Sequence, residues 1–102
     1  MAKEVIWSEQ AVKDLENILR YWNLKNKSNT YSIKLNQLFR EAVKIIAEYP
    51  VIGRPTDVKN VRAKKLRDYF IFYEEREKQI DILSIWNTGK KDLVVSRIPR
   101  RR

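Results

Sequence analysis

The stretch VRAKKLRDYFIFYEE, residues 61–75, decides the fold of this chain. It places four cations among its first seven residues, continues through five consecutive aromatic or aliphatic residues from Tyr69 to Tyr73, and ends on two glutamates. β-Branched and aromatic residues bounded by polar positions are typical of strands. The stretch therefore predicts one strand over residues 61–66 and a second over residues 69–75.

A third strand is predicted over residues 79–86, after a tight turn around Arg76 and Glu77. The three strands form an antiparallel meander. Bulky side chains occupy both alternating sets of positions in the second and third strands, which predicts a sheet that is covered on both faces. Helices can close one face, and the other needs the C-terminal segment, a partner or an aromatic-lined cleft.

Upstream of this stretch, residues 4–7 (EVIW) predict a short strand, and Ser8 stands at a good N-cap position for a helix that reaches about Trp22. A second helix follows the caps at residues 28–30 and stops at Pro50. Two helices joined by a short loop make an antiparallel hairpin. Residues 1–102 are thus predicted to be one α+β domain.

The segment YPVIGRPTD, residues 49–57, contains two prolines and one of only two glycines in the chain. It predicts a loop that leads the chain from the hairpin to the meander.

The composition narrows the functions that are open to the chain. With no cysteine and no histidine, disulfides and thiolate metal sites are excluded, and we expect neither a metal nor a cofactor. The longest apolar or aromatic run, Tyr69 to Tyr73, is far shorter than a membrane span, and the start MAKEVIW lacks the apolar core of a signal peptide. We therefore expect a cytoplasmic protein without a membrane partner.

The net charge is +9, and it is unevenly distributed. Residues 1–50 hold 8 basic and 6 acidic side chains, whereas residues 51–102 hold 14 and 7. The chain ends on a basic tail over about residues 97–102. Such a charge favours a nucleic acid or a strongly acidic protein as partner, although a basic surface that only confers solubility is the alternative.

Four segments in this order resemble the RelE/ParE superfamily, the toxin halves of bacterial type II toxin–antitoxin pairs. They are IWSEQAVKDLENILRYW at 6–22, YPVIGRP at 49–55, VRAKKLRDYFIFYE at 61–74 and IDILSIWN at 80–87. The resemblance covers about residues 4–90. It implies a curved sheet of four strands, with the helical hairpin on the convex side and any active site on the concave face. It also implies growth inhibition and a role such as plasmid stabilisation.

One branch of this superfamily cleaves messenger RNA in the ribosome, and another poisons DNA gyrase. For a metal-independent endoribonuclease, the candidate catalytic residues are Arg62, Lys64 and Arg67. An arginine can neutralise phosphoryl oxygens, and Lys64 or Lys65 could act as the base because neighbouring cations disfavour an ammonium form. The alternative is a basic sheet edge that deters aggregation. The alternation of residues 61–67 breaks near Lys64, which predicts a bulge or bend there.

RNA-cleaving relatives usually carry a tyrosine or histidine after the last strand, and this chain has neither in residues 87–91. That departure favours the gyrase-directed branch. We expect the cations of the second half to gather on one concave surface beside the last strand. The candidate target-binding residues are Arg54, Lys65, Trp86, Lys90 and Lys91.

The partner implied by the resemblance is an acidic antitoxin, to which opposite charge would speed binding. Exposed apolar residues of the hairpin are candidates for its docking, namely Leu19, Trp22 and Leu38, although each is also a plausible core residue. The free toxin is expected to be a monomer. A non-enzymatic basic module that binds nucleic acid or protein remains the third interpretation.

Overall fold

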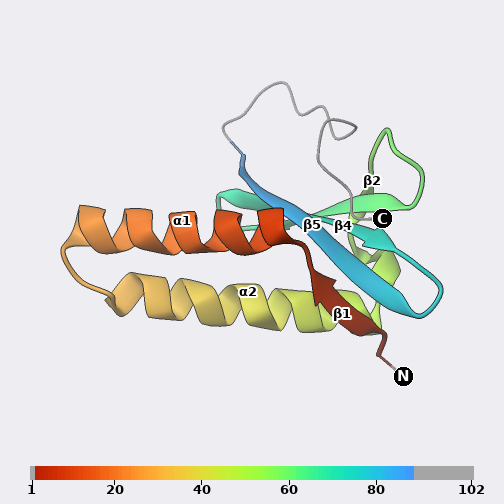
Figure 1. The fold of residues 1–102 in the computed structure, drawn as a ribbon, viewed down its shortest axis with the longest axis horizontal. Coiled ribbons are helices and arrows are strands. Elements are labelled where there is room, and N and C mark those ends of the chain that lie inside the picture. Colours follow the sequence, from red (N-terminus) through yellow and green to blue (C-terminus); the bar gives the residue numbers. More distant parts are fainter. Residues whose placement is uncertain (1, 89–102) are drawn as a thin grey trace.

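The computed structural model describes residues 2–88 and contains two long helices and a five-stranded sheet (Figure 1). The elements are β1 (Glu4–Trp7), α1 (Glu9–Asn26), α2 (Thr30–Glu48), the short 3₁₀ helix η1 (Pro50–Ile52), β2 (Arg54–Pro55), β3 (Val61–Leu66), β4 (Tyr69–Glu75) and β5 (Gln79–Asn87). This order confirms the predicted α+β fold. No helix within residues 2–88 is long and apolar enough to cross a membrane.

Two element ends differ from the prediction, and two short elements are added. β5 ends at Asn87, one residue beyond the predicted end. Helix α1 continues four residues beyond Trp22, to Asn26, because Asn23, Lys25 and Asn26 still tolerate helical backbone before Lys27 adopts a left-handed conformation (φ 53°). The predicted loop after α2 contains η1 and a two-residue strand, β2, so the sheet has five strands instead of four.

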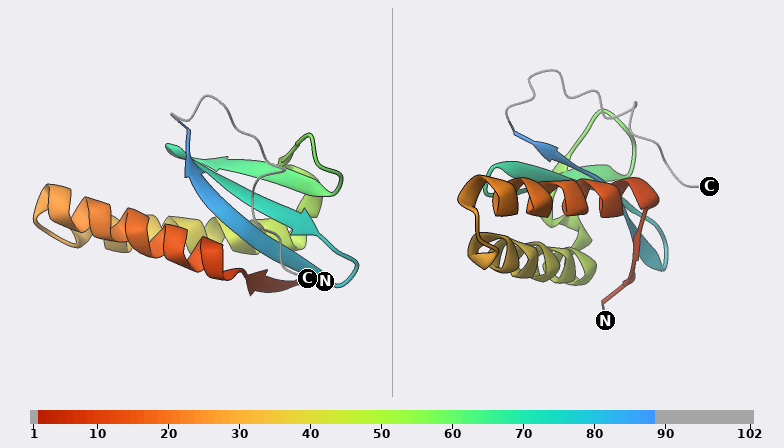
Figure 2. Two further views of the ribbon diagram at one scale, coloured as in Figure 1. Left: turned by 45° about the horizontal axis from the view of Figure 1, so that its top comes forward. Right: turned by 60° about the vertical axis from the view of Figure 1, so that its left-hand side comes forward.

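The strand order is β1-β5-β4-β3-β2, so within the described residues the first strand pairs with the last. β1 runs parallel to β5, and the other neighbours are antiparallel. Both helices pack on one side of the twisted sheet (Figure 2). We call this side the helix-side face and the opposite side the outer face.

The helix-side face carries the larger core. Leu35 and Phe39 of α2 pack with Ile71 and Tyr73 of β4 and Ile82 of β5, all of them fully buried. These residues recur at helical spacing in α2 and at every second position in β4, because each element directs one set of side chains inward.

The outer face carries a smaller core of four buried residues, with Val58, Phe70 and Trp86 packed partly against it. The four are Val61, Ala63, Phe72 and Leu83. Within residues 2–88 the helix-side face is therefore covered by the two helices, and the outer face carries an apolar cluster that no other described element covers.

The irregular point of the sheet lies in β5. β3 pairs with β4 without interruption from Val61 to Leu66, so a bulge near Lys64, one of the two predicted irregularities, is absent. The register instead shifts between Phe72 and Tyr73, leaving Leu83 without a residue opposite on β4. The apolar–polar alternation of β3 is lost where the half-buried Leu66 follows two lysines. This change of residue type needs no inserted residue, because the side chains still alternate between the two faces.

The start of α1 satisfies the polar groups at this shift. Ser8 caps α1 by accepting the N–H of Ala11 (3.0 Å), and its hydroxyl donates to the carbonyl of Leu83 (2.9 Å). The carboxylate of Asp14 accepts the Ser84 hydroxyl (2.6 Å) and the Ile85 N–H (2.9 Å). Buried backbone groups need such partners, so α1 and the irregular part of β5 stabilise each other.

Candidate functional site

The alternation of β3 divides the basic cluster between the two faces of the sheet. Arg62 and Lys64 stand opposite Tyr73 and Ile71 of β4, two residues of the helix-side core. Residues directly opposite each other share a face. Lys65, the residue after Lys64, stands opposite Phe70 and is directed to the outer face. The structure therefore does not gather these cations on one surface, contrary to our expectation.

Of the three candidate catalytic residues, Arg62 is held by the protein itself. Its Nη1 donates to the carbonyl of Gly53 at 2.8 Å. Lys64 lies 3.4 Å from the carbonyl of Lys65 through its Nζ. Arg67 occupies the turn between β3 and β4 with a left-handed backbone (φ 55°). Arg62 and Lys64 thus extend from the same face of β3, and Arg67 extends from the turn that follows it.

Three of the candidate target-binding residues do share the outer face. Arg54 of β2 stands opposite Ala63, and Lys65 stands opposite Phe70, which in turn stands opposite Trp86. Lys65, Phe70 and Trp86 thus form one row across three strands. The row combines one exposed cation with two half-buried aromatic rings.

A pocket of about 420 Å³ lies on this face beside the row. Its floor is apolar and its rim carries one guanidinium, one carboxylate and one hydroxyl; the lining residues are Arg54, Pro55, Thr56, Asp57, Ala63, Phe70 and Phe72. The Phe72 ring lies edge-on to Trp86, with 5.1 Å between their centroids. Such a surface can take an apolar or planar group and fix its orientation with a few polar contacts.

Sequence reasoning missed Thr56, Asp57, Phe70 and Phe72 as residues of this pocket. The signal that could have found the two phenylalanines was the second set of bulky side chains in residues 69–75, because a set that faces away from the helices needs another cover. Nothing in the sequence placed Thr56 and Asp57 beside them, since that proximity depends on the pairing of β2 with β3.

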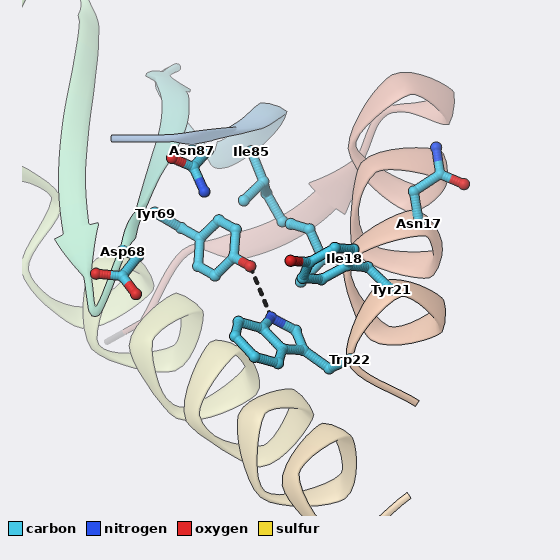
Figure 3. Close-up of a pocket in the computed structure, with 8 residues that line it drawn as sticks. All are labelled: Asn17, Ile18, Tyr21, Trp22, Asp68, Tyr69, Ile85 and Asn87. Carbon is cyan, nitrogen blue, oxygen red and sulfur yellow. Dashed lines mark hydrogen bonds between the residues drawn. The ribbon is translucent and has the colours of Figure 1, made fainter. Parts of the chain in front are cut away.

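A second pocket, of about 320 Å³, lies between α1 and the turn that joins β3 to β4 (Figure 3). The Trp22 indole donates to the Tyr69 hydroxyl at 2.9 Å, as the dashed line in Figure 3 marks. Burial raises the pKa of Tyr69, so this phenol stays protonated at neutral pH. Trp22 therefore ties α1 to β4.

The candidate antitoxin-binding residues are only partly accessible. Leu19 and Trp22 pack against the helix-side core, and Leu38 is half-buried. The most exposed apolar side chain of the hairpin is instead Leu24. Lys90, Lys91 and the basic tail at 97–102 lie outside the described residues.

Within residues 2–88 there is no group of three or more carboxylate, histidine or cysteine side chains that could hold a metal ion. Buried acidic side chains do occur near the turn between β4 and β5. There Arg76 pairs with Asp81 and Glu74, which raises the pKa of the Arg76 guanidinium. The cluster stabilises the turn.

Comparison with known proteins agrees with this architecture. A solved chain of the chromosomal ParDE TA system from P. aeruginosa superposes with a TM-score of 0.74 at 24% sequence identity, over 84% of this chain and 96% of that one. At this identity the likeness shows the fold. A search of curated proteins found no significant match. The family model for the ParE toxin of the type II toxin–antitoxin system, parDE, matches residues 5–91. Since that model spans most of the sequence, the chain belongs to the ParE toxin family.

Proposed function

We propose that this protein, the toxin of a type II toxin–antitoxin pair, inhibits growth in the cytoplasm by binding DNA gyrase through the outer face of its sheet. Membership of the ParE family supports the toxin role. The observation that carries the choice of gyrase over messenger RNA is the division of the β3 cations between opposite faces.

Cleavage of RNA by its own 2′-hydroxyl needs three functions within reach of one phosphate. A base removes a proton, cations neutralise the phosphoryl oxygens, and an acid assists the leaving oxygen. Arg62 and Lys64 share one face of β3, whereas Lys65 and Arg54 lie on the other. The hydrogen bond from Arg62 to Gly53 also occupies one of the donors that a phosphate would need.

Binding to a protein target makes weaker demands, and the outer face meets them. An apolar floor of Phe70 and Phe72 lies beside Arg54 and Lys65. Aromatic residues and arginine contribute most of the free energy at protein interfaces. Inhibition would follow from occupation of the target and would need no covalent chemistry by the toxin.

The test uses purified toxin in two parallel assays, inhibition of DNA supercoiling by gyrase and cleavage of messenger RNA on ribosomes. We expect supercoiling to be inhibited and the message to remain intact. Arg54→Gln and Lys65→Gln should each raise the inhibitory concentration about tenfold, the effect of losing one favourable charged contact. Lys64→Gln, on the other face, is the matched control and should change it less than threefold.

Cut messages with normal supercoiling would overturn the gyrase proposal and favour the ribosome-dependent endonuclease, which the local density of cations in β3 supports. Loss of cleavage in Arg62→Ala and Lys64→Ala, both still folded, would then locate the catalytic residues. Absence of both activities, with retained binding to nucleic acid or protein, would favour the non-enzymatic module.

A further inference from the structure

Four exposed apolar side chains lie within eight residues of one another, at the end of α2 and in η1. They are Ile45 (41% exposed), Tyr49 (63%), Val51 (68%) and Ile52 (44%), which we call the η1 patch. Ile45 and Tyr49 are one helical turn apart, and the N–H of Tyr49 donates to the carbonyl of Ile45 at 2.8 Å. Single exposed apolar residues are ordinary, but a contiguous group marks a contact surface.

The backbone that carries this patch is held from beneath by a buried hydroxyl. The Tyr73 side chain is fully buried, its hydroxyl donates to the carbonyl of Pro50 (2.6 Å), and it accepts the N–H of Gly53 (2.9 Å). Burial raises the pKa of Tyr73, which keeps the donating proton in place. Both ends of η1 are therefore anchored to β4.

Two further features tighten this attachment. A Cβ on Gly53 would lie only 2.6 Å from the Tyr73 hydroxyl oxygen and 3.1 Å from the carbonyl of Ala63, so glycine is required there for space. The Arg62 guanidinium donates to the Gly53 carbonyl. Arg62 thus acts as a positioning residue for the turn.

A rigid turn that presents apolar side chains to water adds little to the stability of the isolated chain, because these side chains are not buried in it. It does lower the entropy that must be lost when a partner binds. The rigidity of η1 and the exposure of its side chains are therefore best explained together, as a prepared contact surface.

We propose that the η1 patch is a docking surface for an acidic amphipathic segment of the antitoxin, an inference that rests on the proposed toxin function. The interfaces between long-lived partners are more apolar than those between transient partners, and the patch is apolar at its centre. In sequence it is flanked by Lys44 and Arg54 against one carboxylate, Glu48. With a net charge of +9 on the chain, this surface suits an acidic partner.

The experiment measures binding of purified toxin variants to the small acidic protein encoded by the reading frame next to the toxin gene. Val51→Asp and Tyr49→Asp should each raise the Kd about 100-fold, as loss of a central interface residue does. Val51→Lys should raise it less than Val51→Asp, since the partner is acidic. The matched control is Leu24→Asp, which replaces an equally exposed apolar residue (72%) at the far end of the hairpin and should change the Kd less than threefold.

Circular dichroism and supercoiling inhibition by the free variants separate the possible outcomes. Variants that stay folded, still inhibit gyrase and escape the antitoxin support the inference. Unchanged antitoxin binding would overturn the inference. If antitoxin binding is unchanged and gyrase inhibition is lost, the patch belongs to the gyrase-binding surface. A wild-type dimer that dissociates in Val51→Asp, with unchanged antitoxin binding, would overturn it in favour of a second copy. If wild-type toxin leaves gyrase unaffected but binds the acidic protein through the patch, the inference holds and only the gyrase proposal fails.

Discussion

The helix-side face of the sheet is closed by two helices over a continuous apolar core, whereas the outer face has, within residues 2–88, only four buried apolar residues and an open pocket. Both faces are built from the same strands. β4 sends Tyr69, Ile71 and Tyr73 to the helices and Phe70 and Phe72 to the other side. The difference separates stability from recognition, because residues that are exposed on one face can change without disturbing the core on the other.

β3 extends this separation to the charges. Arg62, on the helix-side face, serves the fold by donating to the Gly53 carbonyl. Lys65, on the outer face, stands opposite the aromatic ring of Phe70 and is exposed to solvent. Cations that are neighbours in the sequence of a strand are therefore divided between the two faces of the sheet.

The largest expected effect contrasts the two cores. Phe39→Ala, in the helix-side core and fully buried, should lower the free energy of unfolding by about 3–5 kcal/mol, through lost transfer energy and a cavity. Phe70→Ala, half-buried on the outer face, should cost less than about 2 kcal/mol, since a half-exposed ring has less to lose. Urea unfolding followed by circular dichroism measures both. Equal costs would show that the two faces contribute alike to stability.

Gly53→Ala should be next in size, because the new methyl group would press on the Tyr73 hydroxyl and on the Ala63 carbonyl. Overpacking of this kind costs about 1–3 kcal/mol. In Tyr73→Phe the nearer obstacle is removed, so the alanine should cost less in that background. A double-mutant cycle in urea measures the coupling. Strictly additive free energies would mean that the turn can move away from β4.

Asp14→Ala tests the attachment of α1 to the irregular part of β5. It removes the acceptor of the Ser84 hydroxyl and the Ile85 N–H and should cost about 1–3 kcal/mol, the penalty for leaving such groups without a partner. Thermal unfolding measures this cost. Glu16→Ala, exposed on the same helix, is the control and should stay within about 0.5 kcal/mol of the parent.

The smallest effect is confined to alkaline pH. Because burial raises the pKa of Tyr73 above its ordinary value of 10.0, the folded state holds this proton more tightly than the unfolded state does. The contribution of this proton to the free energy of unfolding is fully present below pH 10. It is lost as the pH rises from 10 through the pKa of Tyr73 in the folded state. Tyr73→Phe should therefore lose less stability than the parent between pH 9 and pH 11, measured as urea midpoints. Parallel curves for the two proteins would contradict the buried position of this phenol.

Local patterns in the sequence determined the number, order and type of the long elements. Ser8 followed by helical spacing, Pro50 after the second stripe, and period-two bulky residues in 69–75 each act over a few residues, so they can be recognised without the fold. The same patterns predicted bulky side chains on both faces of the sheet, and each face carries an apolar cluster. The resemblance of four segments to one superfamily added the arrangement of these elements.

Only the tertiary structure decided which residues meet. The pairing of β2 with β3, the register shift at Leu83 and the contact of Gly53 with Tyr73 join residues of different elements, and no local propensity encodes such pairs. The side of the sheet on which each cation of β3 lies follows from the β3–β4 register, because moving a strand by one residue exchanges its two faces. The sequence thus specified a charged strand, and the packing of α2 against β4 and β5 decided which of its charges remain free for a partner.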